Sequence, residues 1–522
     1  MARKQAAGQR PLVQVPTTAQ QLAGVIKSAR DIMRKDKGLS GDLDRLPLLT
    51  WLMFLKFLDD TETMREEEAE LSAQTFRPAI EPPYRWRDWA GDPAGITGPS
   101  LTAFVNQDEA KRPDGTRGPG LLAALRALQS SDSTDRRDVI ARVFRSTANR
   151  MESGYLLRDV VNKIDEIHFT STDEMHTLGR LYESMLREMR DAAGDSGEFY
   201  TPRPVVRFMV EVVDPRLGET VLDPACGTAG FLVEAYTHLA AQCHTVQDRE
   251  TLQRHSIYGG EAKPLPYLLA QMNLVLHGLD APQISPDNSL AVRVTELGER
   301  DRVDVILTNP PFGGEEEGSI KSGFPADKQT SETALLFLQL IMRKLRRAPH
   351  PGRAAVVVPN GTLFGDGVAA RIKEELLKDF NLHTIVRLPQ GVFEPYTAIA
   401  SNLLFFDRSG PTEAVWYYEL PVPEGRKNYT KTRPLQYEEF APCLAWWHDR
   451  ADNEHAWRVP AATILANGCN LDSKNPHAAT DLEHLPPEQL VESILAKEQQ
   501  IAALLIEIKA VPAGRTVVLR CP

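Results

Sequence analysis

Short apolar segments that alternate with helix-forming stretches constrain the fold of this sequence more than any other feature. From about residue 197 onward they read TVLDPA, SIYGGEA, VDVILTNPP, RAAVVVPNG, LHTIVRLP and NLLFFDR. Such short segments, rich in Val, Ile and Leu, are typical of buried strands. Strands joined by crossover helices form a mostly parallel, doubly wound α/β sheet. At roughly thirty residues for each βα unit, the NPP motif should follow the fourth strand.

The chain of 522 residues exceeds what one hydrophobic core usually supports, so we predict three domains. Residues 1–170 should form a helical domain, and residues 171–420 the α/β domain. Residues 421–522 should form a loop-rich, Trp-rich region that ends in a helical tail. The apolar window at residues 46–60 is too short to span a bilayer and contains Lys56, which predicts a buried helix and no membrane segment.

A seven-residue repeat marks the helical tail. It consists of two series with the same spacing: Leu490, Lys497, Leu504 and Ile494, Ile501, Ile508. Such a seam predicts either a partner helix from another chain or packing against this chain itself. The pattern alone leaves both possibilities open.

The charge balance argues against a protein that binds the phosphates of a nucleic acid without a basic partner. The sequence holds 60 basic and 71 acidic residues, a net charge of −11 at pH 7. A DNA-binding role therefore requires a local basic patch or a basic partner. The five cysteines form no CxxC pair, and the first residues contain no apolar signal sequence. These features predict a reducing, cytoplasmic compartment and no structural metal site.

The stretch DVILTNPPFGG at residues 304–314 predicts a pocket at one edge of the sheet. Its apolar half suits a central strand. Pro310 and Pro311 cannot donate hydrogen bonds to a strand ladder, so they must follow the strand's carboxyl end. Open α/β sheets bind ligands at that end. Asn309 should therefore face a pocket, with Phe312 beside it.

The stretch VLDPACGTAGFLVEA at residues 221–235 predicts a glycine-containing turn between a strand and a helix. Glycines allow a ligand to approach closely, and the start of a helix offers free N–H groups. The stretch lacks the GxGxxG fingerprint, and Glu261 follows Gly227 by 34 residues instead of about 20, so a NAD site is the weaker interpretation. Asp223 suits an ammonium group and Glu261 suits ribose hydroxyls. Together they indicate a nucleoside that carries an amino acid.

The order of GEFYTPRPVV, DPACGTAGF, GGEA, DNSL and NPPF resembles the motif order of S-adenosylmethionine-dependent DNA amino-methyltransferases. Further stretches, RAAVVVPNGTLFG, IVRLPQGVFEPYTAIASNLLFF, YTKTRPLQ and NLDSKNP, are similar to the modification subunit, HsdM, of type I restriction–modification systems. The resemblance implies a Rossmann-like methyltransferase sheet, an all-helical amino-terminal domain and a carboxyl-terminal helix. It also implies methylation of the adenine N6 amino group in a specific double-stranded DNA sequence, after base flipping.

The same resemblance implies a catalytic set of four residues. The Asn309 side-chain oxygen and the Pro310 carbonyl would accept the two hydrogens of the adenine amine. Pro311 would stiffen the loop, and Phe312 would stack on the flipped base. The implied cofactor-binding residues come from the other motifs: Tyr200, Thr201, Pro202, Asp223, Ala225, Gly227, Thr228, Gly230, Phe231, Glu261, Asn288 and Ser289.

The resemblance assigns particular residues to each part of S-adenosylmethionine. Residues 200–202 would line the methionine part, and Asp223 and Gly227 its ammonium group and backbone face. Glu261 would bind the ribose, and Asn288 the adenine ring. The implied reaction needs no metal ion and no covalent intermediate.

Two residues depart from the family pattern. Ala229 stands where the family usually has a second glycine, and Gly260 precedes Glu261 where glutamine is common. These departures bear on cofactor affinity and not on the fold.

Other interpretations of the sequence compete with adenine methylation. Cytosine N4 enzymes usually carry Ser-Pro-Pro in place of Asn-Pro-Pro, and protein glutamine N5 enzymes normally carry NPPY and lack the long helical domain. A C5-cytosine enzyme needs a Pro-Cys nucleophile after the fourth strand, whereas Pro442 and Cys443 lie far beyond it. A non-catalytic scaffold of a defence complex would have a damaged NPPF motif or Glu261, and both are intact.

The resemblance also names partners. No region of the chain remains for reading DNA sequence, so another chain, an HsdS-like specificity subunit, would read it. This subunit would dock on the helical tail. A second copy of this chain and double-stranded DNA would complete the modification complex. An HsdR-like restriction and translocase subunit is a further candidate partner.

Overall fold

The computed structural model describes most of the chain. The described residues are 19–73, 75–128, 135–145, 147–167, 201–394, 397, 399–423, 425–426, 428–430 and 432–477. The chain divides into two compact units, residues 1–474 and residues 475–522, and nearly all described residues belong to the first. Tyr200 and the seven-residue repeat of residues 490–508 lie outside the described residues.

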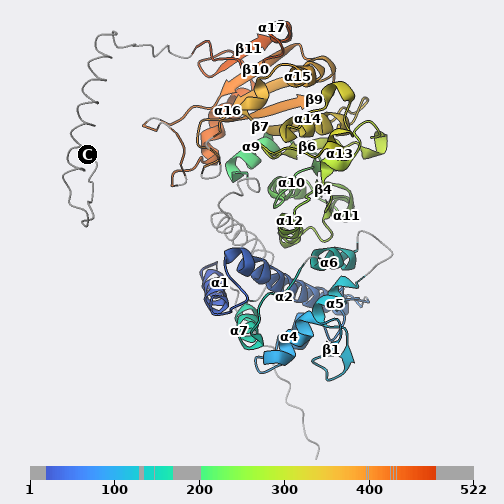
Figure 1. Ribbon diagram of the computed structural model, residues 1–522. Helices are drawn as coiled ribbons and strands as arrows, with labels where there is room; N and C mark the ends of the chain where they lie inside the picture. Colours follow the sequence, from blue (N-terminus) through green and yellow to red (C-terminus); the bar gives the residue numbers. More distant parts are fainter. Residues whose placement is uncertain are drawn as a thin grey trace, which may run out of the picture. The chain divides into compact units, whose positions relative to one another are not determined.

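The amino-terminal part of the described chain is helical, as the sequence predicts (Figure 1). It contains α1 (Ala19–Met33), α2 (Asp42–Leu71), α3 (Trp86–Trp89), α4 (Gly98–Asn106), α5 (Leu121–Arg126), α6 (Arg136–Arg145), α7 (Gly154–Asp165) and a small hairpin of β1 (Ala110–Lys111) and β2 (Arg117–Gly118). The buried helix predicted at residues 46–60 is the first part of α2 and is confirmed. Lys56 is tolerated in this apolar helix because its Nζ donates a hydrogen bond to Asp60 Oδ1 at 2.7 Å.

The larger part of the described chain forms a nine-stranded sheet with the order β11-β10-β8-β9-β7-β6-β3-β4-β5. The strands are β3 (Val221–Asp223), β4 (Ile257–Gly260), β5 (Gln283–Ser285), β6 (Val305–Thr308), β7 (Arg353–Pro359), β8 (Asn381–Arg387), β9 (Ser401–Asp407), β10 (Ala414–Glu419) and β11 (Ala456–Pro460). Neighbouring strands from β5 to β7 are parallel, whereas β9 and β11 run antiparallel to their neighbours. The strand before NPPF, β6, is the fourth of this sheet in chain order, as predicted.

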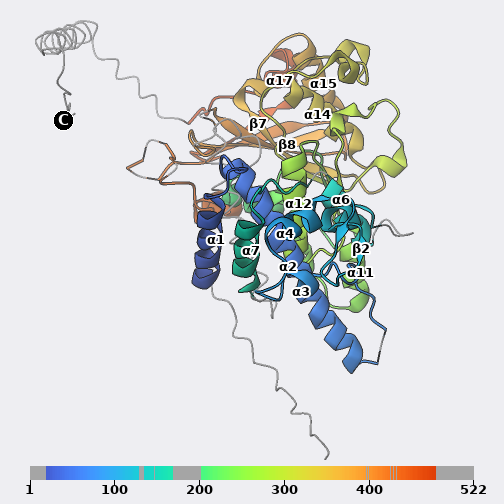
Figure 2. The same cartoon turned by 60° about the horizontal axis from the view of Figure 1, so that its bottom comes forward.

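Helices cover both faces of the sheet, which confirms the predicted doubly wound fold. The helices of this part of the chain are α9 (Arg203–Val213), α10 (Gly230–Ala240), α11 (Val246–His255), α12 (Pro264–Leu276), α13 (Gly318–Lys321), α14 (Thr333–Lys344), α15 (Val368–Asp379), α16 (Ala441–His448) and α17 (Ala461–Ala466). Apolar side chains of α9, α10 and α16 pack in one cluster, and those of α14, α15 and α17 pack in another. Figure 2 shows α14, α15 and α17 together on one side of β7 and β8. The strands between two such layers are buried on both faces, which explains their continuous apolar sequence.

The region after residue 421 holds more regular structure than the loop-rich stretch that the sequence predicts. Trp446 and Trp447 lie in α16, and Trp457 lies in β11, an edge strand that pairs with β10. The prediction of loops was wrong here because these elements are short and their aromatic residues show no clear helical or strand periodicity.

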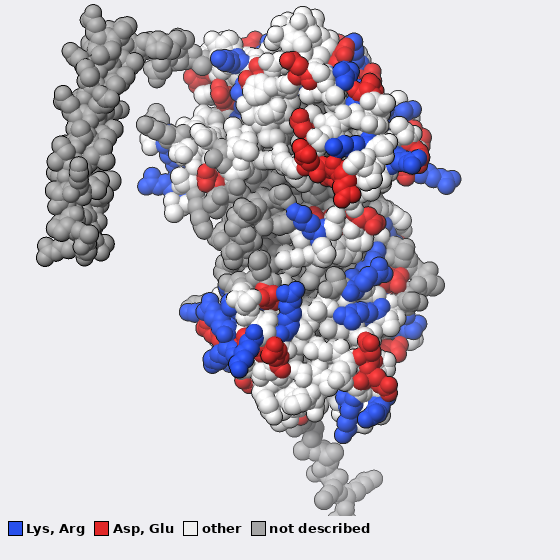
Figure 3. Space-filling view, viewed as in Figure 1, with Lys and Arg blue, Asp and Glu red and all other residues white. Residues whose placement is uncertain are grey.

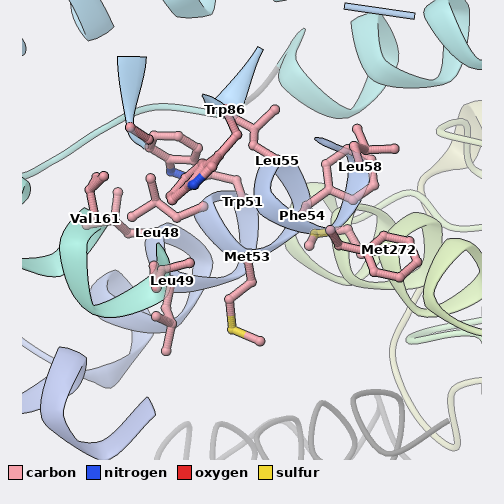
Figure 4. Packing of buried hydrophobic residues seen from close by; sticks show 14 of the residues in the cluster. Leu48, Leu49, Trp51, Met53, Phe54, Leu55, Leu58, Trp86, Val161 and Met272 are labelled. Carbon is pink, nitrogen blue, oxygen red and sulfur yellow. The ribbon is translucent and has the colours of Figure 1, made fainter. Parts of the chain in front are cut away.

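One apolar cluster joins the amino-terminal helices to α12 of the α/β part. Figure 4 shows Met272 of α12 beside Phe54 of α2, and both side chains are buried. Nearby, the Asp280 carboxylate accepts hydrogen bonds from Arg65 at 3.0 Å and from Arg136. The arginines hold the pKa of Asp280 below its usual value, although its burial acts in the opposite direction. The amino-terminal helices and α12 thus share one apolar cluster.

No helix among the described residues combines the length and the apolar composition that crossing a bilayer requires.

Candidate active site

The register of the parallel strands brings four chain segments to one edge of the sheet. Asp223, at the end of β3, pairs with Gly259 of β4, and Gly260 pairs with Ser285 of β5. β6 lies on the other side of β3 and ends at Thr308. The residues that follow these strands must therefore emerge side by side, as the sequence predicts for the carboxyl ends of a parallel sheet.

Asn309 is half-buried directly after β6. Its Nδ2 donates a hydrogen bond to Thr201 Oγ1 at 3.1 Å. Its Oδ1 is buried and has no hydrogen-bond partner among the described residues. The amide is therefore held at its nitrogen and presents an unused acceptor, which is an unusual arrangement for a buried polar atom.

Thr308 connects the catalytic candidate to the turn after β3. The Thr308 side chain is fully buried, and its Oγ1 donates a hydrogen bond of 2.6 Å to Asp223 Oδ1. The backbone N–H of Ala225 donates to the same oxygen at 3.1 Å. Asp223 thus fixes the end of β6 and the start of the turn at once.

Burial gives Asp223 an unusual proton affinity. The residue is only 1% exposed. Desolvation raises its pKa to about 7, although the hydrogen bonds from Thr308 and Ala225 favour the charged form. A nearby cation would lower this pKa again, so the side chain has the properties of a partner for a positively charged group.

The turn from Pro224 to Ala229 is held by backbone contacts and one carboxylate. The Gly227 N–H donates to Glu261 Oε2 at 3.0 Å, and the Lys263 N–H donates to Glu261 Oε1 at 2.8 Å. Gly227 has a φ of +53°, in the left-handed region that favours glycine. Glu261 therefore lies against the turn, and both predicted site residues meet.

Two further side chains anchor the start of α10. Arg203 Nη1 donates to the Gly230 carbonyl at 2.8 Å, and Asn273 Nδ2 donates to the Thr228 carbonyl at 2.8 Å. The turn is thus fixed from α9 and from α12. Phe231 is buried in the apolar cluster below the turn, so its side chain serves the core.

Ala229, the first departure from the family pattern, adopts the conformation of the glycine it replaces. Its φ is +64° and its ψ is 32°, at the N-cap of α10. A left-handed conformation costs a residue with a Cβ about 1–2 kcal/mol. The residue is fully buried, so the surrounding core holds it there.

Gly260, the second departure, has a steric reason. A Cβ at this position would lie 2.3 Å from Ser289 Oγ and 3.2 Å from the Pro224 carbonyl oxygen. Any side chain would require Ser289 to move. The predicted site residue Ser289 is therefore fitted against the space that Gly260 leaves open.

Asn288 precedes a short 3-10 helix (Ser289–Ala291) and caps it. Its Oδ1 accepts the Leu290 N–H at 2.9 Å. Its Nδ2 lies 3.5 Å from Glu316 Oε2, at the outer limit of a hydrogen bond. The Asn288 Nδ2 is therefore the atom of this amide that is available to donate a hydrogen bond to a ligand.

The remaining catalytic candidates line the loop after Asn309. Pro310 is buried, and Pro311 and Phe312 are half-buried. Phe312 packs edge-to-face against Phe393, with ring centroids 5.6 Å apart. The Phe312 ring therefore belongs to the same loop as Asn309 and packs against Phe393, and its place beside the Asn309 oxygen stays a prediction.

Hydrogen bonds link some of the predicted residues in pairs: Thr201 with Asn309, Asp223 with Ala225, and Gly227 with Glu261. The structure adds four side chains that the sequence did not single out. These are Thr308, Arg203, Asn273 and Phe393. Thr308 and Arg203 lie within or next to the quoted motifs, so their polar character was a usable signal. Asn273 and Phe393 carry no spacing signal of their own.

Cys443 does not fit the role of a nucleophile. The residue is fully buried in α16, and desolvation raises the pKa of its thiol above the usual value. Among the described residues, no group of three His, Cys, Asp or Glu side chains is arranged to hold a metal ion.

The site combines a hydrogen-bond acceptor, an aromatic ring and a rigid turn with acidic neighbours. It can orient an N–H-bearing ligand beside a second molecule that carries hydroxyl and ammonium groups. These are the requirements for transfer between two bound molecules.

Comparison with known proteins shows the family to which the chain belongs. The N-6 DNA methylase family matches residues 173–484, and the HsdM N-terminal domain family matches residues 22–164. The chain belongs to the N-6 DNA methylase family, and within it to the methylase subunits of type I restriction–modification systems. This confirms the predicted family.

Individual relatives agree over most of the chain. The type I restriction enzyme EcoEI methylase subunit of Escherichia coli is 47% identical over 481 residues, which cover 90% of this chain and 94% of the relative. A crystal structure of a type I modification subunit from Vibrio vulnificus YJ016 is 68% identical, with a TM-score of 0.86, and covers 91% of this chain and 100% of its own. A chain from a structure of a type I restriction–modification system, solved to explain complex assembly and conformational transition, is 39% identical, with a TM-score of 0.74. The match covers 96% of this chain and 100% of that chain.

The raised pKa of Asp223 predicts a pH-dependent stability. Because the pKa in the folded chain exceeds the ordinary value of 3.8, this carboxyl stabilises the fold at low pH, and its contribution is lost as the pH rises toward about 7. Asp223→Asn keeps an acceptor oxygen without the charge. The free energy of unfolding of Asp223→Asn minus that of the native chain should be about 1–3 kcal/mol larger at pH 8 than at pH 5, measured by denaturant unfolding. Asp452→Asn, on the surface, is the control. An equal stability difference at both pH values would contradict the assignment.

Proposed function

We propose that this adenine-specific DNA methylase subunit takes its methyl group from S-adenosylmethionine and orients the adenine N6 amine with Asn309. The observation that carries the proposal is the buried Asn309 Oδ1, which has no partner among the described residues. A buried acceptor without a donor costs about 1–3 kcal/mol. An amine in the pocket supplies that donor.

The chemistry explains why an amide and a proline suit this position. The exocyclic amine of adenine is a poor nucleophile, because its lone pair is delocalised into the ring. Asn309 Oδ1 and the Pro310 carbonyl would accept its two hydrogens, localise the lone pair and fix its direction. When bound, S-adenosylmethionine supplies a methyl group on a positively charged sulfur. Pro311 stiffens the loop that carries these acceptors.

The turn between β3 and α10 fits such a cofactor. Glu261 lies against the turn and suits the ribose hydroxyls. Asn288 has its oxygen engaged and offers its nitrogen to the adenine ring. Asp223 suits the ammonium group, because a cation beside it favours its charged form. Tyr200 stays a prediction for the methionine part.

Phe312 would hold the target base after it leaves the DNA helix. A base that is stacked in a duplex cannot reach this edge of the sheet, so base flipping is part of the proposal. Stacking on an aromatic side chain is worth about 1–3 kcal/mol. Phe393 supports the Phe312 ring from its side.

The competing chemistries receive less support. Family membership favours adenine N6 over cytosine N4 and protein glutamine N5. The buried Cys443 argues against a covalent C5-cytosine mechanism. The intact Asn309 and Glu261 argue against a scaffold without activity.

We further propose a division of labour within a type I complex in the prokaryotic cytoplasm. On the face in Figure 3, basic and acidic side chains of the described residues are interspersed and form no continuous basic band. The net charge of −11 favours sequence reading by another chain, an HsdS-like specificity subunit, with a second copy of this chain beside it. An HsdR-like subunit could join them. The proposed domains are residues 1–170, 171–420 and 421–522. The last has a helical tail for docking and contributes the edge strand β11 to the sheet of the second.

Removal of residues 486–522 tests the docking role of the tail. The truncated chain should no longer co-purify with the specificity subunit, because the seven-residue repeat supplies the apolar seam. The full chain is the control in the same affinity purification. Continued co-purification of the truncated chain would refute the docking role of the tail.

Substitution of Asn309 tests the catalytic proposal. Asn309→Ala should lower methyl transfer to DNA at least a hundredfold, because it removes the acceptor that orients the amine. Affinity for S-adenosylmethionine, measured by calorimetry, should stay within about threefold. Asn162→Ala, in α7, should keep full transfer. Loss of cofactor binding in Asn309→Ala, or retained transfer, would contradict the role of Asn309.

A further inference from the structure

We propose that Thr201 is a positioning residue that sets the orientation of the Asn309 amide. The sequence places Thr201 among the residues that line the cofactor. The structure gives it a second contact, because its Oγ1 accepts a hydrogen bond from Asn309 Nδ2 at 3.1 Å. This inference rests on the proposed function and adds a residue to it.

The orientation of the amide decides whether Asn309 can act. The two ends of an asparagine side chain have the same shape but opposite hydrogen-bonding character. With Nδ2 directed to Thr201, Oδ1 remains as the unused buried acceptor. With the amide reversed, its N–H groups would face the hydrogens of the adenine amine. That arrangement would repel the amine and leave its lone pair delocalised.

Both partners of this hydrogen bond are held on separate, rigid elements. Thr201 precedes Pro202, the N-cap of α9, and the first residue of that helix, Arg203, donates a hydrogen bond to the Gly230 carbonyl at 2.8 Å. Asn309 directly follows Thr308, which is tied to Asp223 at 2.6 Å. The Thr201–Asn309 contact therefore joins two fixed points, so it can define the amide orientation with little loss of entropy.

The contact is compatible with a role for Thr201 toward the cofactor. A hydroxyl group has two acceptor lone pairs and one hydrogen to donate. The bond from Asn309 uses one lone pair, and the hydrogen remains for a neighbouring acceptor group. The two roles differ in what they predict: loss of the amide orientation lowers the rate of transfer, whereas loss of a cofactor contact lowers affinity.

The test compares Thr201→Val, which has nearly the same shape and no acceptor, with Thr201→Ser, which retains Oγ. The full chain co-purified with its specificity subunit is assayed for methyl transfer to unmethylated host DNA. Thr201→Val should lower kcat about three- to tenfold, with the Kd for S-adenosylmethionine within about twofold of the native value. Thr201→Ser should restore most of the lost rate. Thr251→Val is the control, because the Thr251 hydroxyl bonds only the Gln247 carbonyl within α11.

Several outcomes would overturn the inference. A native kcat in Thr201→Val would do so, as would a defect confined to cofactor affinity or a Thr201→Ser variant as slow as Thr201→Val. Thr201→Ala provides the same comparison if the valine variant does not fold. Asn309→Ala separates this inference from the proposed function. Loss of transfer in Asn309→Ala together with a native rate in Thr201→Val rejects only the role of Thr201, whereas transfer by Asn309→Ala rejects both.

Discussion

The parallel pairing of β3 with β6 is the constraint on which the rest of the site depends. Because the two strands are neighbours, the glycine-containing turn after β3 and the NPPF loop after β6 leave the sheet at the same edge. The Thr308–Asp223 hydrogen bond, at 2.6 Å between two buried side chains, locks this arrangement. A slip of one residue would turn Thr308 to the other face of the sheet and carry Asn309 away from the turn.

The sequence predicted the features that depend on periodicity or on several motifs together. The doubly wound sheet, the position of NPPF after the fourth strand and the buried helix at residues 46–60 are confirmed. The short strand β11 and helix α16 were missed, because few residues carry their pattern. Asn273 was missed for another reason: a single polar residue in a buried helix gives no sign of its partner until the fold brings the two together.

The two departures from the family pattern show how local structure absorbs a substitution. Ala229 keeps the left-handed conformation of a glycine, at a cost of about 1–2 kcal/mol that the surrounding core offsets. Gly260 makes room for Ser289, whose Oγ occupies the space of a side chain at that position. Neither change disturbs the contacts of Glu261 with the turn. Family membership and these intact contacts agree with a working site.

The central claim is that this chain, guided by a specificity subunit, methylates adenine at N6. The direct measurement is a single-base map of modified bases in host DNA after co-expression of the two chains. The expected result is N6-methyladenine within one recurring sequence, and none when this chain is omitted. Unmodified adenines, or methyl groups on cytosine N4 in their place, would contradict it.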